Sequence, residues 1–266
     1  MPITSKPTPD YLSKKNTHER DAYITFDEGP HIYTVHGEQG YTSVTTFVHH
    51  HFPSFDSNAI LDRIMKSKKM QDPTYKYYGK TREEILSDWD KNRDQAACAG
   101  TNMHYDVECY FNQMSVENES IEFKYFKNFV KDFPDLTPYR TEWMVYYEEY
   151  KLSGSIDMVF ENPDGTIQIY DWKRCKSIER ESFGGATALT PCISHIPDSN
   201  FWHYAIQLNM YKMILERKYG KKVTDLYLVC LHPDNFYGNY DRIQVPILTE
   251  EIEELLEWWK KEHVTI

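Results

Sequence analysis

Residues 154–173 constrain the fold of this chain more than any other stretch does. Residues 156–160 and 166–172 are runs of β-branched and aromatic side chains, and an Asn-Pro-Asp-Gly sequence at 162–165 separates them. Such runs favour extended strands, whereas Asn, Pro, Asp and Gly are preferred in turns. The stretch therefore predicts a β-hairpin.

Three charged residues interrupt this largely apolar hairpin. Asp157 lies on the first predicted strand, and Asp171 and Lys173 lie near the end of the second. Because side chains alternate between the two faces of a strand, Asp171 and Lys173 face the same side of the sheet. Carboxylates on neighbouring strands can hold a divalent cation beside the lysine. Solvated charges on an outward face are the alternative, but charges that end an apolar strand favour a functional site.

The composition bounds the class of protein. The chain has 266 residues, of which 40% are apolar and 27% charged, as expected for a soluble globular protein with one sizeable core or at most two small domains. The net charge of -11 argues against nonspecific coating of nucleic acid, which needs many lysines and arginines, but allows a local basic groove. The five cysteines are scattered without a Cys-x-x-Cys pair, which predicts free thiols.

No segment of the sequence indicates a membrane or a secretory pathway. The first thirty residues lack the apolar core of a signal peptide, and no apolar run approaches the length of a membrane span. We therefore expect an intracellular protein of the cytoplasm or nucleus, with an organelle as an open alternative.

The first half of the chain is predicted to be mainly helical. Residues 1–20 are polar and proline-containing, which predicts a flexible tail, and a small hairpin follows at 23–35. Ser43 is placed to cap a short helix that ends in three histidines at 49–51. Adjacent helical residues point in different directions, so these histidines cannot meet at one ion and are expected to be solvated. Further helices are predicted, at about 57–69, from 81 with a kink or a junction at 100–101, at 102–112 and at 120–132.

The second half alternates between strands and helices. Strands are predicted at 139–150, in the hairpin, at 223–231 and at 242–247, with helices at 201–219 and 249–263. This order predicts an α/β or α+β fold with a central mixed sheet flanked by helices. We expect residues 21–266 to form one domain, in which 21–98 are an N-terminal hairpin and helical part and 99–266 the core. The connection at 181–200 has the length of a disordered segment or a lid.

Two helices carry polar pairs at a spacing of four. His104 and Glu108 share one face of a predicted helix, and Gln207 and Tyr211 share one face of another. Taken alone, the first pair fits an ordinary interaction on a helix surface. Together with the acidic hairpin, it is a candidate part of a metal site.

These motifs resemble those of a known family. Gly100-Thr101-x-x-His104-x-x-x-Glu108, Gly154-x-x-Asp157, Asp171-x-Lys173 and Gln207-x-x-x-Tyr211 follow the order and approximate spacing of the RecB-like branch of the PD-(D/E)XK nucleases. With a Ser-Val-Thr-Thr segment at 43–46, the chain looks most like the mitochondrial genome maintenance exonuclease family. The resemblance covers about residues 40–230. It implies a restriction-endonuclease-like core and metal-dependent hydrolysis of DNA, usually from a free end and often on single strands.

The resemblance also implies roles for individual residues. Asp157 and Asp171 would bind Mg²⁺ or Mn²⁺ with the carbonyl of Trp172, and hard oxygen ligands suit these ions. His104 and Glu108 would complete or support the metal site, and Lys173 would orient the attacking water. The residues expected to brace the site or contact DNA are Gln207, Tyr211, Arg174 and Thr101.

Two departures from the family pattern affect these expectations. Relatives commonly carry a small hydroxyl residue directly after the lysine, whereas Arg174 and Cys175 stand here, so contacts to the DNA backbone at this edge are in doubt. No cysteine trio follows Cys230, so no iron-sulfur cluster is expected.

Three functions are compatible with the motifs. The first is an exonuclease that acts on single-stranded DNA or duplex ends in replication, repair or recombination. The second is a structure-specific endonuclease. The third is a nucleic-acid-binding module of nuclease fold that has lost its chemistry, against which the presence of Asp157, Asp171 and Lys173 argues.

Overall fold

The computed structural model describes residues 7–263 and divides the chain into two compact units. One unit comprises the described residues up to Pro53 together with those from Met103 onward, and the other comprises residues 54–102. The helices are α1 (Tyr11–Lys15), α2 (Val44–His50), α3 (Ser57–Lys66), α4 (Arg82–Phe111), α5 (Ile121–Asp132), α6 (Asn200–Lys218) and α7 (Thr249–His263). The strands are β1 (Ile24–Asp27), β2 (Ile32–Val35), β3 (Thr42–Ser43), β4 (Thr137–Tyr147), β5 (Leu152–Glu161), β6 (Ile167–Lys173), β7 (Val223–Cys230) and β8 (Asp241–Gln244).

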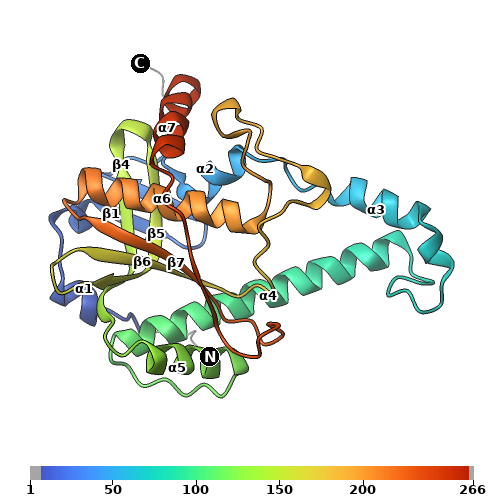
Figure 1. Cartoon of the computed structure of the whole chain (residues 1–266), viewed down its shortest axis with the longest axis horizontal. Coiled ribbons are helices and arrows are strands. Elements are labelled where there is room, and N and C mark those ends of the chain that lie inside the picture. The colour runs from blue at the N-terminus through green and yellow to red at the C-terminus, as the bar shows by residue number, and fades with distance from the viewer. Residues whose placement is uncertain (1–6, 264–266) are drawn as a thin grey trace. The chain divides into compact units, whose positions relative to one another are not determined.

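The larger unit is built on a six-stranded mixed sheet (Figure 1). β5 and β6 form the predicted antiparallel hairpin, and β4 runs antiparallel along the other edge of β5. β6 and β7 are parallel, and β8 returns antiparallel to β7. The predicted α/β fold with a central mixed sheet flanked by helices is therefore confirmed.

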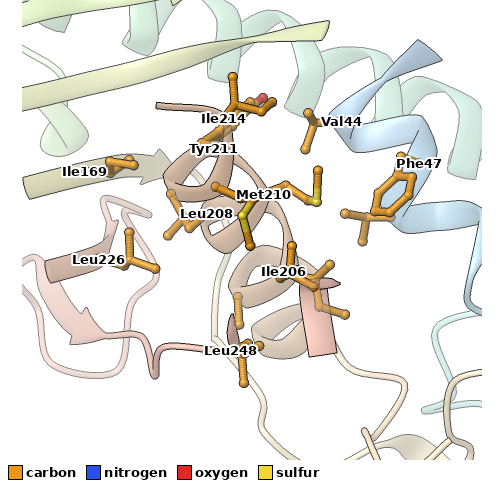
Figure 2. Packing of buried hydrophobic residues seen from close by; sticks show 14 of the residues in the cluster. Val44, Phe47, Ile169, Ile206, Leu208, Met210, Tyr211, Ile214, Leu226 and Leu248 are labelled. Carbon is orange, nitrogen blue, oxygen red and sulfur yellow. The ribbon is translucent and has the colours of Figure 1, made fainter. Parts of the chain in front are cut away.

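Each face of the sheet is covered by a separate apolar core. On one face, side chains of α2, α6 and α7 pack against β4 to β7, and Figure 2 shows α6 residues gathered with Val44 and Phe47 of α2 and Ile169 of β6. On the other face, aromatic residues of α5 and the last turns of α4 pack against Tyr170 and Trp172 of β6. β6 is therefore packed on both faces, and the strand that carries Asp171 and Lys173 lies between the two cores.

The smaller unit has a core of its own. Leu61, Tyr77 and Ile85 are buried together there. Thr81 and Glu84 form a capping box at the start of α4, because each side chain accepts a hydrogen bond from the backbone N–H of the other residue. α4 continues through Gly100 and Thr101 as one helix, so a junction of two helices at this point is wrong.

The N-terminal segment differs from the predicted tail over much of its length. Residues 1–6 lie outside the described part of the chain, but α1 and a short 3-10 helix at Glu19–Tyr23 are well defined. Leu12 is buried, and its N–H donates to Asn112 Oδ1 at 2.9 Å. Asn16 donates to the carbonyl of Tyr139 at 2.7 Å, which fastens the segment to β4.

The connection at 181–200 is ordered in its second half. Two short 3-10 turns, Phe183–Gly185 and Pro191–Ile193, lie within it. Ile193 and Ile196 are buried in the core that covers α6, and the N–H of Leu189 donates to the carbonyl of His51 at 2.8 Å.

Within the described residues, no helix combines the length and apolar character needed to cross a bilayer.

His51 is fully buried, which corrects the expectation of three solvated histidines. Its Nδ1 lies 2.8 Å from Thr190 Oγ1, whereas His49 and His50 are exposed. Burial, followed by the nearby His50 and His263, lowers the pKa of His51 to about 4. The folded protein therefore keeps this imidazole neutral at a pH at which the unfolded chain protonates it.

This burial predicts a pH dependence of stability. Only the unfolded state gains a proton between its pKa of 6.5 and the folded value of about 4, so the contribution of His51 is complete above pH 6.5 and falls as the pH drops. We expect the free energy of unfolding to lose about 2 kcal/mol from this group between pH 7.5 and 5. Urea unfolding of the wild type, His51→Gln and the exposed control His50→Gln measures it. The expectation fails if His51→Gln has the same pH dependence as the wild type.

Candidate metal centre at the fork of the sheet

β5 and β6 separate at the point where their acidic residues occur. The last residue pair between them is Met158 with Tyr170, and Asp157 and Asp171 lie one residue further on. Beyond this point the backbone N–H of Trp172 donates to Asp157 Oδ2 at 2.9 Å. The side chain thus takes a hydrogen bond from the neighbouring strand, and the two strands form a fork that carries both carboxylates.

Three side chains converge at this fork with the donor atoms of a metal site. His104 of α4, Glu142 of β4 and Asp157 of β5 each offer one ligand atom, and these atoms lie within 4.8 Å of one another. His104 Nδ1 is 3.5 Å from Asp157 Oδ2 and 3.8 Å from Glu142 Oε1. One nitrogen and two carboxylate oxygens from three separate elements can hold a divalent cation.

Glu142 is the residue of this group that the sequence analysis missed. It lies within β4 between two paired residues, Thr141 and Trp143, and has a left-handed backbone with φ of 41°. Its Oε2 accepts a hydrogen bond from Ser155 Oγ at 2.9 Å. A left-handed glutamate inside a strand costs on the order of 1 kcal/mol, and such strain gathers at functional sites. The sequence signal that could have identified Glu142 is its position as an acidic residue in the aromatic-rich strand that directly precedes the hairpin.

Asp171 and Lys173 form a buried ion pair on the second arm of the fork. Asp171 is 2% exposed, and its Oδ2 lies 2.5 Å from Lys173 Nζ. Apart from this contact with the ammonium group, Oδ2 has no hydrogen-bond partner among the described residues. Lys173 Nζ also lies 4.4 Å from the centre of the Tyr204 ring. A buried carboxylate oxygen that faces a single ammonium group keeps a lone pair that can bind a cation.

The pKa values of His104, Glu108 and Asp171 are all raised, because the buried acidic groups at the centre are not balanced by enough positive charge. Burial alone would lower the pKa of His104, but Asp157 and Glu142 raise it to about 9. Burial, and then Glu142, raises the pKa of Glu108 to about 8. Burial likewise raises the pKa of Asp171 to about 6, although Lys173 opposes it. A divalent cation would supply the missing charge, so the donor set of one nitrogen and two carboxylates fits a divalent metal ion.

Glu108 lies beside this group. With Glu142 it lines a pocket of about 190 Å³, which also contains Arg140 and Asp21. The geometry places Glu108 near Glu142 and does not place it among the three converging ligand atoms. Its predicted part in supporting the metal site remains a prediction.

Gly154 of β5 packs against Tyr211, one of the two residues of the Gln207 and Tyr211 pair on α6. A Cβ atom at Gly154 would lie 2.8 Å from both Cε1 and Oη of Tyr211, so the tyrosine ring packs directly on the glycine backbone. Tyr211 is 3% exposed, which suits bracing of β5 better than contact with DNA. Gln207 Nε2 donates to Thr45 Oγ1 at 3.3 Å and is only partly buried. The motifs at 154–157 and 207–211 are therefore in contact.

The other predicted residues are not brought into the converging group. Arg174 turns away to α5, where its guanidinium lies 2.8 Å from Glu122 Oε1. Thr101 is exposed and belongs to the smaller unit. Trp172 buries its ring in the second core and offers its N–H to Asp157, while its carbonyl as a metal ligand remains a prediction.

The fold and the site together define an α/β protein with a candidate divalent-metal centre at the fork of its sheet. The sequence matches no protein-family model and no curated protein. Among solved structures, a crystal structure from Eubacterium rectale described as "Putative exonuclease" is similar over 57% of this chain and 68% of that chain, with 12% identity and a TM-score of 0.28. A likeness at this level carries no argument about function, so the proposal below depends on the site and on the sequence motifs.

Proposed function

We propose that this chain is a metal-dependent deoxyribonuclease that hydrolyses phosphodiester bonds of DNA. The observation that carries the proposal is the joining of His104, Glu142 and Asp157 next to the buried pair of Asp171 and Lys173. Carboxylates that hold a hard cation, with a lysine beside them, can activate a water and stabilise the charge that develops on a phosphodiester during hydrolysis. The order of the sequence motifs, in which four pieces resemble one nuclease family, supports the same assignment.

The side chains divide the chemical work among them. Asp157, Glu142 and His104 would hold Mg²⁺ or Mn²⁺, with Asp171 completing the set from the other arm of the fork. A cation held there would supply a water of lowered pKa and would polarise a phosphoryl oxygen. Lys173, whose pKa is raised because Asp171 and Asp157 outweigh its burial, stays protonated and can donate to the negative oxygens of the transition state.

The finer assignment is an exonuclease that removes nucleotides from free ends of single-stranded DNA in replication, repair or recombination. It is supported by the resemblance of the motifs to the mitochondrial genome maintenance exonuclease family. A structure-specific endonuclease is the alternative, and circular DNA separates the two because a circle has no end.

The test compares linear and circular single-stranded DNA of the same sequence, with Mg²⁺, with Mn²⁺ and with EDTA. We expect short products from the linear strand, intact circles, and no reaction in EDTA. Asp171→Asn should lower the rate about a hundredfold or more, because one electrostatic contact to the transition state is worth several kcal/mol. Asp135→Asn, at an exposed aspartate, is the matched control and should keep full activity.

Two results would change the assignment. Cut circles would favour the endonuclease. Equal activity of the wild type and Asp171→Asn would mean that the observed hydrolysis does not come from this centre, and the nuclease proposal would then be rejected.

A further inference from the structure

Two aromatic rings stand in solvent on the loop between β7 and β8. Phe236 is 93% exposed and its neighbour Tyr237 is 69% exposed. Single apolar residues on a surface need no explanation, but two adjacent large rings leave a contiguous apolar patch in water. The two ring centres lie 5.5 Å apart and the ring planes are nearly perpendicular, so the rings meet at an edge and leave faces open.

The loop holds these rings on a fixed turn. Asn235 is largely buried, its N–H donates to the carbonyl of His232 at 3.0 Å, and its Oδ1 accepts from the N–H of Tyr237 at 2.9 Å. The N–H of Gly238 donates back to the carbonyl of Asn235 at 3.0 Å. The turn therefore presents the rings in a defined position.

The end of the loop is fastened to α5. Tyr240 Oη donates to Asp132 Oδ2 at 2.7 Å, and Asn128 Nδ2 donates to Asn239 Oδ1 at 2.9 Å. Ordering a loop costs conformational entropy, and this loop is ordered without burying its two rings. The exposed pair is thus a supported surface feature and not a frayed tip.

The loop begins at the C-terminal end of β7, which lies beside the end of β6 that carries Asp171 and Lys173. Cys230, the last residue of β7, pairs with Lys173, and the N–H of Leu231 donates to the carbonyl of Lys173 at 2.8 Å. Figure 1 shows β6 and β7 side by side with their connecting loops leaving from this end. The six residues from Leu231 to Phe236 can span at most about 20 Å, which lies within reach of a short single strand bound at the centre.

The charge beside the loop suits a phosphate backbone. Lys176 lies three positions after Lys173, the last residue of β6, and its side chain is 71% exposed. It lies 3.7 Å from Asp234 at the start of the turn, a surface pair that is weak enough to exchange for another anion. Lys176 thus meets the loop two residues before Phe236, and basic side chains together with aromatic faces are the combination that single-strand sites use.

We propose that Phe236 and Tyr237 form a stacking platform for unpaired bases of the DNA strand that the metal centre cleaves. The inference rests on the proposed function and names its substrate more closely. Unpaired bases offer free faces to an aromatic ring, whereas the bases of a duplex are covered by their neighbours. The platform therefore favours single strands over duplexes, without preference for a base sequence.

The experiment measures binding in the inactive Asp171→Asn background, so that the strand stays intact. Fluorescence anisotropy gives Kd for a labelled single strand, for a strand of the same length with abasic sites, and for a duplex. We expect Phe236→Ala with Tyr237→Ala to weaken single-strand binding about tenfold or more, and to leave the other two ligands unchanged. Tyr23→Ala, at a half-exposed tyrosine of the N-terminal region, is the matched control.

Each outcome has a distinct meaning. Unchanged single-strand binding by the double variant would overturn the platform, and so would an equal loss for the abasic strand, because both exclude base stacking. If the two rings instead bound a protein partner, the double variant would bind the single strand as well as its parent does. Hydrolysis of DNA by the wild-type protein is assayed alongside, so that a failed platform with active wild type leaves the proposed function intact. Absence of both hydrolysis and DNA binding would overturn the two together.

Discussion

Replacing Asp157 with asparagine is expected to lower metal-dependent DNA hydrolysis at least about a hundredfold. Asparagine keeps the size of the side chain and an oxygen that can accept the N–H of Trp172, so the fork should keep its shape. It removes the negative charge that Asp157 contributes to the group with His104 and Glu142. The loss should therefore appear as weaker Mn²⁺ binding by titration calorimetry and as a lower single-turnover rate.

Glu142→Gln provides the comparison that separates this site from a general acidic patch. Because Ser155 can still donate to the amide oxygen, the variant should fold normally and yet lose activity to a similar degree. Glu119→Gln, at a fully exposed glutamate, should behave as the wild type. If Asp157→Asn or Glu142→Gln bound Mn²⁺ and cleaved DNA as well as the wild type, the centre as described here would be wrong.

Gly154→Ala is expected to destabilise the larger unit by about 1–3 kcal/mol. The added methyl group would lie 2.8 Å from two atoms of the Tyr211 ring, and the ring is buried and cannot swing into solvent. Either β5 or α6 must shift, and β5 carries Asp157 only three residues further on. We therefore expect both a lower free energy of unfolding in urea and a reduced rate of DNA hydrolysis.

Gly100→Ala is the matched control for this effect. Apart from its chain neighbours and the nearby backbone of α4 itself, no heavy atom of the described residues lies within 4 Å of a Cβ at Gly100. Alanine should stabilise this helix by up to about 1 kcal/mol relative to glycine. Equal stability of Gly154→Ala and the wild type would show that Tyr211 does not pack on the glycine as described.

Local chemistry explains why several elements were predictable from the sequence. The turn residues at 162–165 lie between two apolar runs, and β5 and β6 pair around them. Thr81 and Glu84 cap α4 with side chains three residues apart, and α7 spans the predicted residues 249–263. In each case the information lies within a few residues along the chain, where propensity and hydrogen bonding act directly.

Contacts between distant segments explain what the sequence analysis did not find. Leu12 is buried, and its N–H donates to an asparagine one hundred residues away, so part of the polar, proline-containing segment is packed against the larger unit. His51 is buried because Thr190 and α7 close over it, although its neighbours remain in solvent. Arg174 follows the metal-centre lysine in sequence, yet its charge is taken by Glu122 of α5.

The sequence by itself determined the hairpin, the mixed α/β architecture and the candidates Asp157, Asp171, Lys173 and His104, because each depends on residue type and spacing within one element. Only the tertiary structure decided that Glu142 joins His104 and Asp157, because three elements meet there and the ligand atoms come within 4.8 Å only after β4 pairs with β5. The separation of β5 from β6 beyond Met158 is likewise a property of the assembled sheet. Metal ligands are selected by distances in space, and spacing along a chain specifies those distances only within a single helix or strand.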